Sequence, residues 1–293
     1  MGGKLAIYIP AYNEERSIGS VVLQAKKYGR VIVIDDGSGD RTAQVAALAG
    51  ASVIGRGSNG GYGAALQDIL EEARKAPEGA FVIMDGDYQH NPSDIPKIAK
   101  PVLEGNADVA VGSRQGGNYS GASRTRKTGV WLLNNLASLK TGENGLDYEC
   151  GFRCLSREAA RKIRIRETGY PACTELVSSA VGAGLRTASV PISVKFYGKP
   201  GNGSAQQGIG VGKYLLEEIA YHKPLFFFGL AGIALLVCSA LLGAFVVETF
   251  YSQKVLPIGS ALLTVFTGVG GLVMLLMGIN LYTLNAVLKK RGD

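Results

Sequence analysis

The sequence predicts an α/β domain followed by a helical hairpin. Short apolar runs alternate with stretches of helical spacing through the first part of the chain, which is typical of a mainly parallel sheet flanked by helices. The last part differs, because residues 223–293 hold only 5 of the 31 basic and 2 of the 24 acidic side chains. We therefore expect a domain over residues 1–208, a connecting helix over 209–222 and a two-helix hairpin over 223–293.

The elements of the α/β domain follow from this alternation. The strands are expected at Leu5–Ile9, Val31–Ile34, Ala51–Ile54, Phe81–Met84 and Val109–Val111. The helices are expected at Ser17–Tyr28, Thr42–Ala49, Ala64–Lys75 and Ser93–Leu103, with Ser17, Asp40 and Ser93 at N-cap or first-turn positions. Such sheets bind ligands beyond the carboxyl ends of their strands, so the loops that follow the strands bear on function.

The hairpin contains two runs that are long enough to cross a membrane. Leu225–Val247 has 23 residues without a charge, and a second uncharged run covers Ile258–Leu288. A bilayer core of about 30 Å needs about 20 helical residues. Basic residues flank both outer ends, which places these ends and the α/β domain in the cytoplasm. The alternative is a pair of buried helices in a soluble core.

The connecting helix has apolar residues on one side of Val211–His222. We expect it either to lie at the bilayer interface or to pack on the sheet.

The net charge of +7 raises the question of nucleic acid as a partner. No Lys/Arg-rich run with interleaved aromatic residues occurs before residue 222, so we expect no nucleic-acid binding. A membrane surface or phosphate ligands explain the charge better. The oligomeric state is left open, a homo-oligomer included.

Three loops at successive strand ends are acidic or glycine-rich: Pro10–Glu15, Asp35–Thr42 and Asp85–His90. Together they indicate one site at the edge of the sheet. No P-loop is present and no Gly-x-Gly-x-x-Gly follows the first strand, which argues against an ordinary ATP or dinucleotide site.

The third loop has the composition of a metal site. Asp85 and Asp87 are two residues apart in an extended run, so both carboxylates point to the same side, and Gly86 lets a ligand approach the backbone. With the amide oxygen of Gln89 they make an oxygen-only ligand set that suits Mg²⁺ or Mn²⁺. A capped turn between strand and helix is the alternative.

The combined motifs resemble a known family. Pro10-Ala-Tyr-Asn-Glu, Asp35-Asp-Gly-Ser, Asp85-Gly-Asp-Tyr-Gln-His and Gly112-Ser-Arg114 are similar to those of family 2 glycosyltransferases, in particular the polyprenyl-phosphate (dolichyl-phosphate) hexosyltransferases. The resemblance implies a GT-A fold and a nucleotide-sugar donor of the GDP-mannose or UDP-glucose type. It also implies a divalent metal, Mg²⁺ or Mn²⁺, and inversion at the anomeric carbon.

The resemblance also assigns the donor residues. Pro10, Tyr12 and Glu14 would line the nucleoside. Asp36, with Asp35 as the second choice, would bind the base. Asp85 would face the ribose and the metal, and Asp87 and Gln89 would ligate the metal. Tyr12 is equally a candidate core aromatic, and His90 is read as a structural residue in preference to a catalytic base.

A cationic segment is the candidate acceptor site. Between Val109 and Gly142 there is no acid, and the cations are Arg114, Arg124, Arg126, Lys127 and Lys140. The glycines in this segment predict a flexible loop near the membrane, and arginine binds phosphate bidentately. A solvated basic face is the alternative. The resemblance assigns Arg114 to a phosphate, with Arg126 as the second arginine and Arg124 as its alternative.

Two further segments resemble the family. Asp147-Tyr-Glu-Cys-Gly-Phe-Arg153 is similar to a family segment, and Glu175 falls in the acidic helix that follows it. Lys195 stands where the family often has an arginine, within Val194–Gly198, and we include it in the acceptor and catalytic set. Lysine cannot form the bidentate fork of arginine, so the acceptor loop departs from the family pattern at this position.

The chemistry expected from these residues is an in-line displacement. A lipid phosphate is largely dianionic at pH 7 and needs no general base to attack the anomeric carbon. Asp87, Arg114, Arg126 and Lys195 would then act by electrostatics and positioning. The alternatives are a polysaccharide synthase, whose Gln-x-x-Arg-Trp segment is missing here, and a non-catalytic sugar-nucleotide-binding membrane protein.

Overall fold

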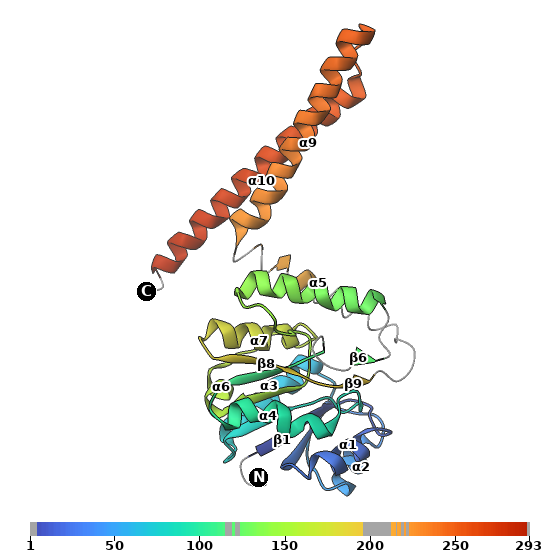
Figure 1. Cartoon of the computed structure of the whole chain (residues 1–293), viewed down its shortest axis with the longest axis vertical. Coiled ribbons are helices and arrows are strands. Elements are labelled where there is room, and N and C mark those ends of the chain that lie inside the picture. Colours follow the sequence, from blue (N-terminus) through green and yellow to red (C-terminus); the bar gives the residue numbers. More distant parts are fainter. Residues whose placement is uncertain are drawn as a thin grey trace. The chain divides into compact units, whose positions relative to one another are not determined.

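The computed structural model describes residues 5–114, 119–120, 124–195, 212–214, 216–217, 220 and 223–291. At residues 119–120, 124–126, 195 and 285–291 only the backbone is described. The chain divides into two compact units, Met1–Tyr214 and Leu215–Asp293 (Figure 1). The first unit holds the α/β domain, and the second holds the helical hairpin.

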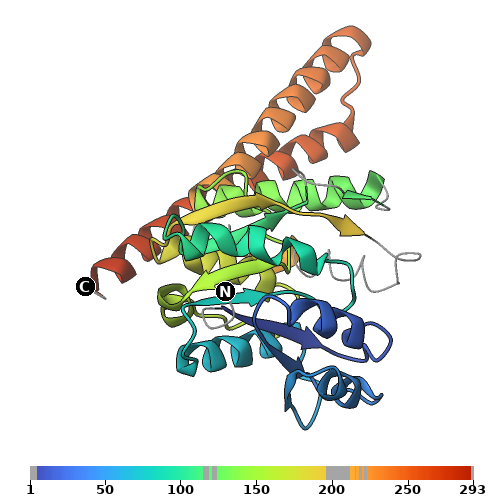
Figure 2. The ribbon, with the colours of Figure 1, turned by 60° about the horizontal axis from the view of Figure 1, so that its bottom comes forward.

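A seven-stranded sheet forms the centre of the first unit (Figure 2). Its strands are β1 (Leu5–Ala11), β2 (Arg30–Asp35), β3 (Ser52–Gly55), β4 (Ala80–Ile83), β5 (Val109–Ser113), β7 (Arg153–Ser156) and β8 (Thr187–Pro191). They lie in the order β3-β2-β1-β4-β7-β5-β8, and all neighbours are parallel except the two pairs that involve β7. The predicted mainly parallel sheet is confirmed, with its five expected strands.

Helices flank this sheet, as the alternation predicts. The helices are α1 (Ile18–Ala25), α2 (Thr42–Leu48), α3 (Tyr62–Lys75), α4 (Ile95–Leu103), α5 (Arg124–Thr141), α6 (Arg157–Lys162) and α7 (Ala172–Gly182). A 3₁₀ turn, η1 (Pro92–Asp94), precedes α4. All seven residues of β1 are buried, and α3 and α4 pack on different strands of the sheet. The core therefore lies around β1 and β4.

The polar residues stand at the helix starts as the sequence predicts. Ser17 is the N-cap residue of α1, but its hydroxyl makes no capping hydrogen bond and instead donates to the Glu14 carboxylate at 2.7 Å. Asp40 accepts from the Thr42 backbone N–H at 2.9 Å and so stabilises the start of α2. Before α4, Asn91 is the capping residue, because its side chain accepts from the Ser93 backbone N–H at 3.1 Å.

A second, two-stranded sheet joins distant segments of the first unit. β6 (Tyr119–Ser120) pairs in parallel with β9 (Val194–Lys195), and Lys195 lies opposite Ser120. Val194 also forms a bridge with His90. The small sheet therefore brings the segment after β5, the segment after β8 and the Asp85–His90 loop together.

The cationic segment is more regular than the sequence predicted. We expected a flexible loop over Val109–Gly142, but residues 124–141 form the 18-residue helix α5. Glycines 116, 117 and 121 lie outside the described residues. Of the connecting helix predicted over 209–222, the structure describes 212–214, 216–217 and 220, which are helical; the rest lies outside the described residues.

The second unit is a hairpin of two long helices, α9 (Pro224–Gln253) and α10 (Ile258–Arg291). They pack through small residues: a Cβ atom on Gly232 would lie 2.8 Å from the Gly271 carbonyl oxygen, and the Ser239 hydroxyl donates to the Thr264 carbonyl at 2.8 Å. Both helices are long and apolar enough to cross a membrane. Only 6% and 11% of their most apolar windows are buried, so the described hairpin does not fit the alternative of buried core helices.

Candidate active site

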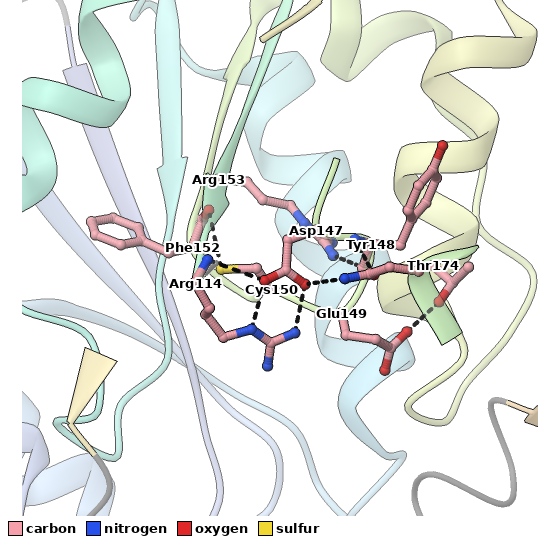
Figure 3. Close-up of polar contacts among 9 residues, drawn as sticks. Arg114, Asp147, Tyr148, Glu149, Cys150, Phe152, Arg153 and Thr174 are labelled. Atoms are coloured by element: carbon pink, nitrogen blue, oxygen red, sulfur yellow. Dashed lines mark hydrogen bonds and ion pairs between the residues drawn. The ribbon is translucent and has the colours of Figure 1, made fainter. Parts of the chain in front are cut away.

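The antiparallel strand β7 explains how the site is assembled. The carboxyl ends of β1, β2, β4 and β5 meet at one edge of the sheet because these strands are parallel. β7 runs the opposite way between β4 and β5, so its amino-terminal end reaches this same edge. The segment Asp147–Phe152 therefore lies beside the loops that follow β4 and β5. Figure 3 shows the side chains of this region.

Asp85 and Asp87 follow β4 at this edge, and both are partly buried. Asp85 accepts from the Tyr62 hydroxyl at 3.2 Å. Its carboxylate also lies against the backbone of Gly151, where a Cβ atom would be 2.5 Å from Oδ2. A side chain at position 151 would therefore displace the Asp85 carboxylate from this position.

The electrostatics of this pair suit a cation. Burial raises the pKa of both carboxyls, and the negative charge of Asp85 raises the pKa of Asp87 further. Asp87 Oδ1 accepts from the Gln89 backbone N–H at 2.9 Å, which fixes the turn. Among the described residues, no three His, Cys, Asp or Glu side chains are grouped to hold a metal ion. The donors available in the predicted ligand set are thus two carboxylates and the Gln89 amide, all of them oxygen ligands.

His90 is buried behind the carboxylates. Its ring stacks on Phe152 with centroids 5.2 Å apart, and its Nδ1 accepts from the Asp85 backbone N–H at 3.4 Å. Burial lowers the pKa of His90 to about 4, so the ring is neutral at pH 7. This environment agrees with the structural role that we favoured for His90.

The expected nucleoside residues lie at the ends of β1 and β2. Tyr12 is 47% exposed, which is inconsistent with a core aromatic and leaves the ring available to a ligand. Glu14 accepts from Ser17, and burial raises the pKa of its carboxyl. Pro10 is buried within β1, and Asp35 is buried and accepts from the Ser38 hydroxyl.

Asp36 organises the loop that leads into α3. Its two oxygens accept from the backbone N–H groups of Gly60 and Gly61, at 2.9 and 2.8 Å. Arg56 Nε lies 3.2 Å from Asp36 Oδ1. Only 4% of Asp36 is exposed, so this carboxylate holds the loop in place. Sequence reasoning, which assigned Asp36 to the base, did not detect this structural role.

Arg114 is held by a buried ion pair at the end of β5. Its Nε and Nη2 atoms donate to the two oxygens of Asp147, each at 2.6 Å (Figure 3). Asn134 on α5 also donates to Asp147 and accepts from the Tyr148 backbone N–H at 3.0 Å. Burial alone would raise the pKa of Asp147, but the Arg114 charge and these hydrogen bonds outweigh it and lower the pKa.

Arg153 is a second buried cation, fully enclosed at the start of β7. Its Nη2 donates to the Tyr148 carbonyl at 2.9 Å, whereas Nε and Nη1 have no hydrogen-bond partner among the described residues. The Arg153 charge lowers the pKa of Asp85 and of Glu149, against the larger effect of burial. Glu149 accepts from the Thr174 hydroxyl (Figure 3). This arginine therefore supplies positive charge beneath the carboxylates.

The remaining acceptor residues are placed by their backbone. Arg124 and Arg126 begin α5, and Lys195 ends β9 next to Ser120. Their side chains lie outside the described part of the chain. Lys195 thus lies on the strand that pairs with the segment after β5. The motif in the sequence includes Asp147 and Arg153, but it does not predict that Asp147 pairs with Arg114. The contact of Tyr62 with Asp85 was not predicted either.

Similarity to known proteins identifies the family of this chain. Residues 6–164 match the family described as Glycosyl transferase family 2. The chain belongs to this family. Among family 2 relatives, a dolichyl-phosphate hexose transferase of Haloferax volcanii is 33% identical over 224 residues, which are 73% of this chain and 95% of that protein. A UDP-N-acetylglucosamine–dolichyl-phosphate N-acetylglucosaminyltransferase of Methanococcus voltae is 30% identical over 209 residues, 64% of this chain and 83% of that protein.

A solved structure shows the same fold. Glucosyl-3-phosphoglycerate synthase from Mycobacterium tuberculosis, crystallised with Mn²⁺, UDP and glucosyl-3-phosphoglycerate, is similar with a TM-score of 0.61 at 23% identity. The similarity covers 74% of this chain and 80% of that one. The GT-A fold expected from the motifs is thereby confirmed.

Proposed function

We propose that this family 2 glycosyltransferase moves a hexose from a nucleotide sugar, of the GDP-mannose or UDP-glucose type, to polyprenyl or dolichyl phosphate at the cytoplasmic face of a membrane. The observation that carries the proposal is that Asp85 and Asp87, after β4, lie at the same sheet edge as Arg114, at the end of β5, where the cationic segment continues. The same chain contains two candidate membrane spans. The relatives named for transfer to dolichyl phosphate support the same acceptor class.

The donor would bind across the ends of β1, β2 and β4. Pro10, Tyr12 and Glu14 would line the nucleoside, and Asp36, with Asp35 as the second choice, would contact the base. Because Asp36 already accepts two backbone N–H groups, a base would use the remaining lone pairs of its carboxylate.

A divalent cation, Mg²⁺ or Mn²⁺, fits the carboxylates at the end of β4. Asp85, Asp87 and Gln89 would hold it, since hard oxygen ligands suit both ions and leave positions for diphosphate oxygens. A bound cation would offset the mutual repulsion of the two carboxylates and the charge of the leaving nucleoside diphosphate. The Mn²⁺ in the solved relative supports this class of cofactor.

The acceptor side would be the segment after β5 and helix α5. Arg126, or Arg124 in its place, would bind the lipid phosphate together with Lys195 and Arg114, and Asp147 holds the Arg114 side chain in position. On α5, Trp131, Leu132 and Leu139 are 56%, 52% and 47% exposed. Exposed tryptophan and leucine on a helix without acidic residues favour contact with a bilayer, where the acceptor's phosphate is found.

The reaction follows from the charge of the acceptor. A phosphate monoester has a second pKa of about 6, so its oxygen attacks the anomeric carbon as an anion. The new carbon–oxygen bond forms while the bond to the diphosphate oxygen breaks, and the anomeric carbon inverts. The cationic side chains hold the acceptor in line and offset the repulsion between the two anions. No proton has to be removed, which agrees with the neutral, buried His90.

The proposal is tested with membranes that contain the full-length protein, labelled UDP-glucose or GDP-mannose, polyprenyl phosphate and Mn²⁺. We expect label in the lipid fraction, and no label after chelation of the metal. Asp87→Asn should reduce transfer at least about a hundredfold, because it removes a charged metal ligand. Glu158→Gln, on the exposed surface of α6, is the matched control and should leave transfer unchanged. Absence of lipid-linked sugar with every common donor would refute the proposal.

A further inference from the structure

Tyr170 is the half-exposed member of a stacked tyrosine pair. Its ring lies parallel to that of Tyr62, with centroids 5.8 Å apart and planes 10° apart. Tyr62 is the residue whose hydroxyl donates to Asp85. Stacking covers one face of the Tyr170 ring, yet 47% of the residue remains exposed. An exposed aromatic ring therefore stands one residue away from the candidate metal carboxylates.

The segment that carries Tyr170 is fixed from two sides. The Thr168 carbonyl accepts from the backbone N–H of Gly63, at 2.7 Å, at the start of α3. The Glu175 carboxylate accepts from the backbone N–H groups of Arg166 and Glu167, both at 2.9 Å. Glu175 thus has a structural role here. Because its backbone is anchored in this way, Tyr170 is a preorganised contact for a ligand.

The position of Tyr170 along the sheet edge indicates which part of the donor it would contact. Residues that would border the nucleoside lie at the ends of β1 and β2. Tyr170 instead stacks on Tyr62, whose hydroxyl donates to Asp85 at the end of β4. A donor that extends from β2 toward β4 would therefore place its sugar, not its base, near Tyr170.

We propose that the Tyr170 ring packs against the transferred hexose and contributes to the choice of sugar. A pyranose ring has an apolar face of C–H groups, which is suited to an aromatic surface backed by a second ring. This inference rests on the proposed function, because it assumes a nucleotide-sugar donor. It makes Tyr170 a residue of the sugar subsite, separate from the nucleoside and diphosphate subsites.

The test is isothermal titration calorimetry on the full-length protein in detergent with Mn²⁺. UDP-glucose is compared with UDP, and GDP-mannose with GDP, so that the sugar contribution is isolated in whichever pair binds. Tyr170→Ala should weaken binding of the nucleotide sugar about three- to tenfold, the range of an aromatic contact, and change the Kd of the nucleoside diphosphate by less than about twofold. Tyr170→Phe should keep the wild-type affinity because it keeps the ring.

Leu48→Ala is the control variant, since Leu48 is 89% exposed on α2. Equal weakening of nucleotide sugar and nucleoside diphosphate by Tyr170→Ala would overturn the sugar contact and assign Tyr170 to the structure of the site. Unchanged affinities would also overturn it, and a loss in Tyr170→Phe equal to that in Tyr170→Ala would refute the ring contact. If the wild-type protein binds no nucleotide sugar, the proposed function itself fails, whatever Tyr170 does.

Discussion

Arg114 shows how one side chain can be a motif residue and a structural residue at once. The sequence assigned it to phosphate by resemblance, but its fork is bound to Asp147 at 2.6 Å, and only 8% of Arg114 is exposed. Burying both charges is tolerated because Asn134 also donates to Asp147. Removing one partner would leave the other charge buried without compensation, which is far more damaging than the loss of a surface pair.

Asp147→Asn should therefore destabilise the α/β domain by about 3 kcal/mol. For a domain of about 200 residues this lowers the midpoint of thermal unfolding by roughly 6–12 °C, measured at pH 7 on the full-length protein. Glu158→Gln breaks the exposed pair with Lys162 and should cost less than about 1 kcal/mol. An equal fall of the unfolding midpoint in Asp147→Asn and Glu158→Gln would show that the buried pair stabilises the domain no more than the exposed pair does.

The same pair predicts a pH dependence. The pKa of Asp147 is lower in the folded protein than its ordinary value of about 4, so its stabilisation is fully present above that value. It is lost as the pH falls through the folded pKa. The gap in midpoint between wild type and Asp147→Asn should therefore narrow below about pH 4. If the difference in unfolding midpoint instead widened below pH 4, it would contradict a lowered pKa for Asp147 in the folded protein.

At the scale of elements, the predictable part of the fold is the part with strong alternation. Wholly apolar strands such as β1 and β4 and the helices between them follow from the pattern. Strand β7 was not predicted, because its four residues include the charged Arg153 and therefore do not form a continuous apolar run. Helix α5 was not predicted, because its cations and the neighbouring glycines resemble a loop.

Of the candidate site, the sequence predicts the carboxylates that follow the strands, such as Asp85 and Asp87. It does not predict contacts between distant segments, such as the hydrogen bond from Tyr62 to Asp85, because these depend on how the helices and strands pack.

The reversed direction of β7 has a testable consequence at Gly151. This strand brings the Gly151 backbone against Asp85, and Gly151→Ala would place a methyl group 2.5 Å from one carboxylate oxygen. We expect Asp85 to be displaced and metal-dependent transfer to fall at least about tenfold, because small misplacements of catalytic groups have large effects on rate. Gly182→Ala on α7 is the matched control, since nothing lies within 4 Å of its added Cβ. Wild-type transfer in Gly151→Ala would mean that Asp85 need not keep this position.

At the scale of the whole molecule, the chain combines a charged domain with a nearly uncharged hairpin. The hairpin keeps basic residues at its outer ends, Lys223 and 289–291, whereas Lys254 and Glu248 near its turn cancel. In the first unit, exposed apolar residues on α5 accompany the cations of the same segment. Both patterns favour a protein that works on a lipid-borne anionic acceptor from the cytoplasmic side.

This topology predicts which residues are reached from outside the cell. Val255, in the turn between α9 and α10, is 63% exposed, and Leu48 is 89% exposed on the α/β domain. In a Cys238→Ser background, where the three remaining cysteines are buried, Val255→Cys should react with a membrane-impermeant maleimide on intact cells. Leu48→Cys should react only after the cells are permeabilised, because the proposed topology has the basic outer ends of the hairpin, and the α/β domain, in the cytoplasm. The reverse pattern would place the α/β domain outside, away from cytoplasmic nucleotide sugars, and would contradict the proposed function.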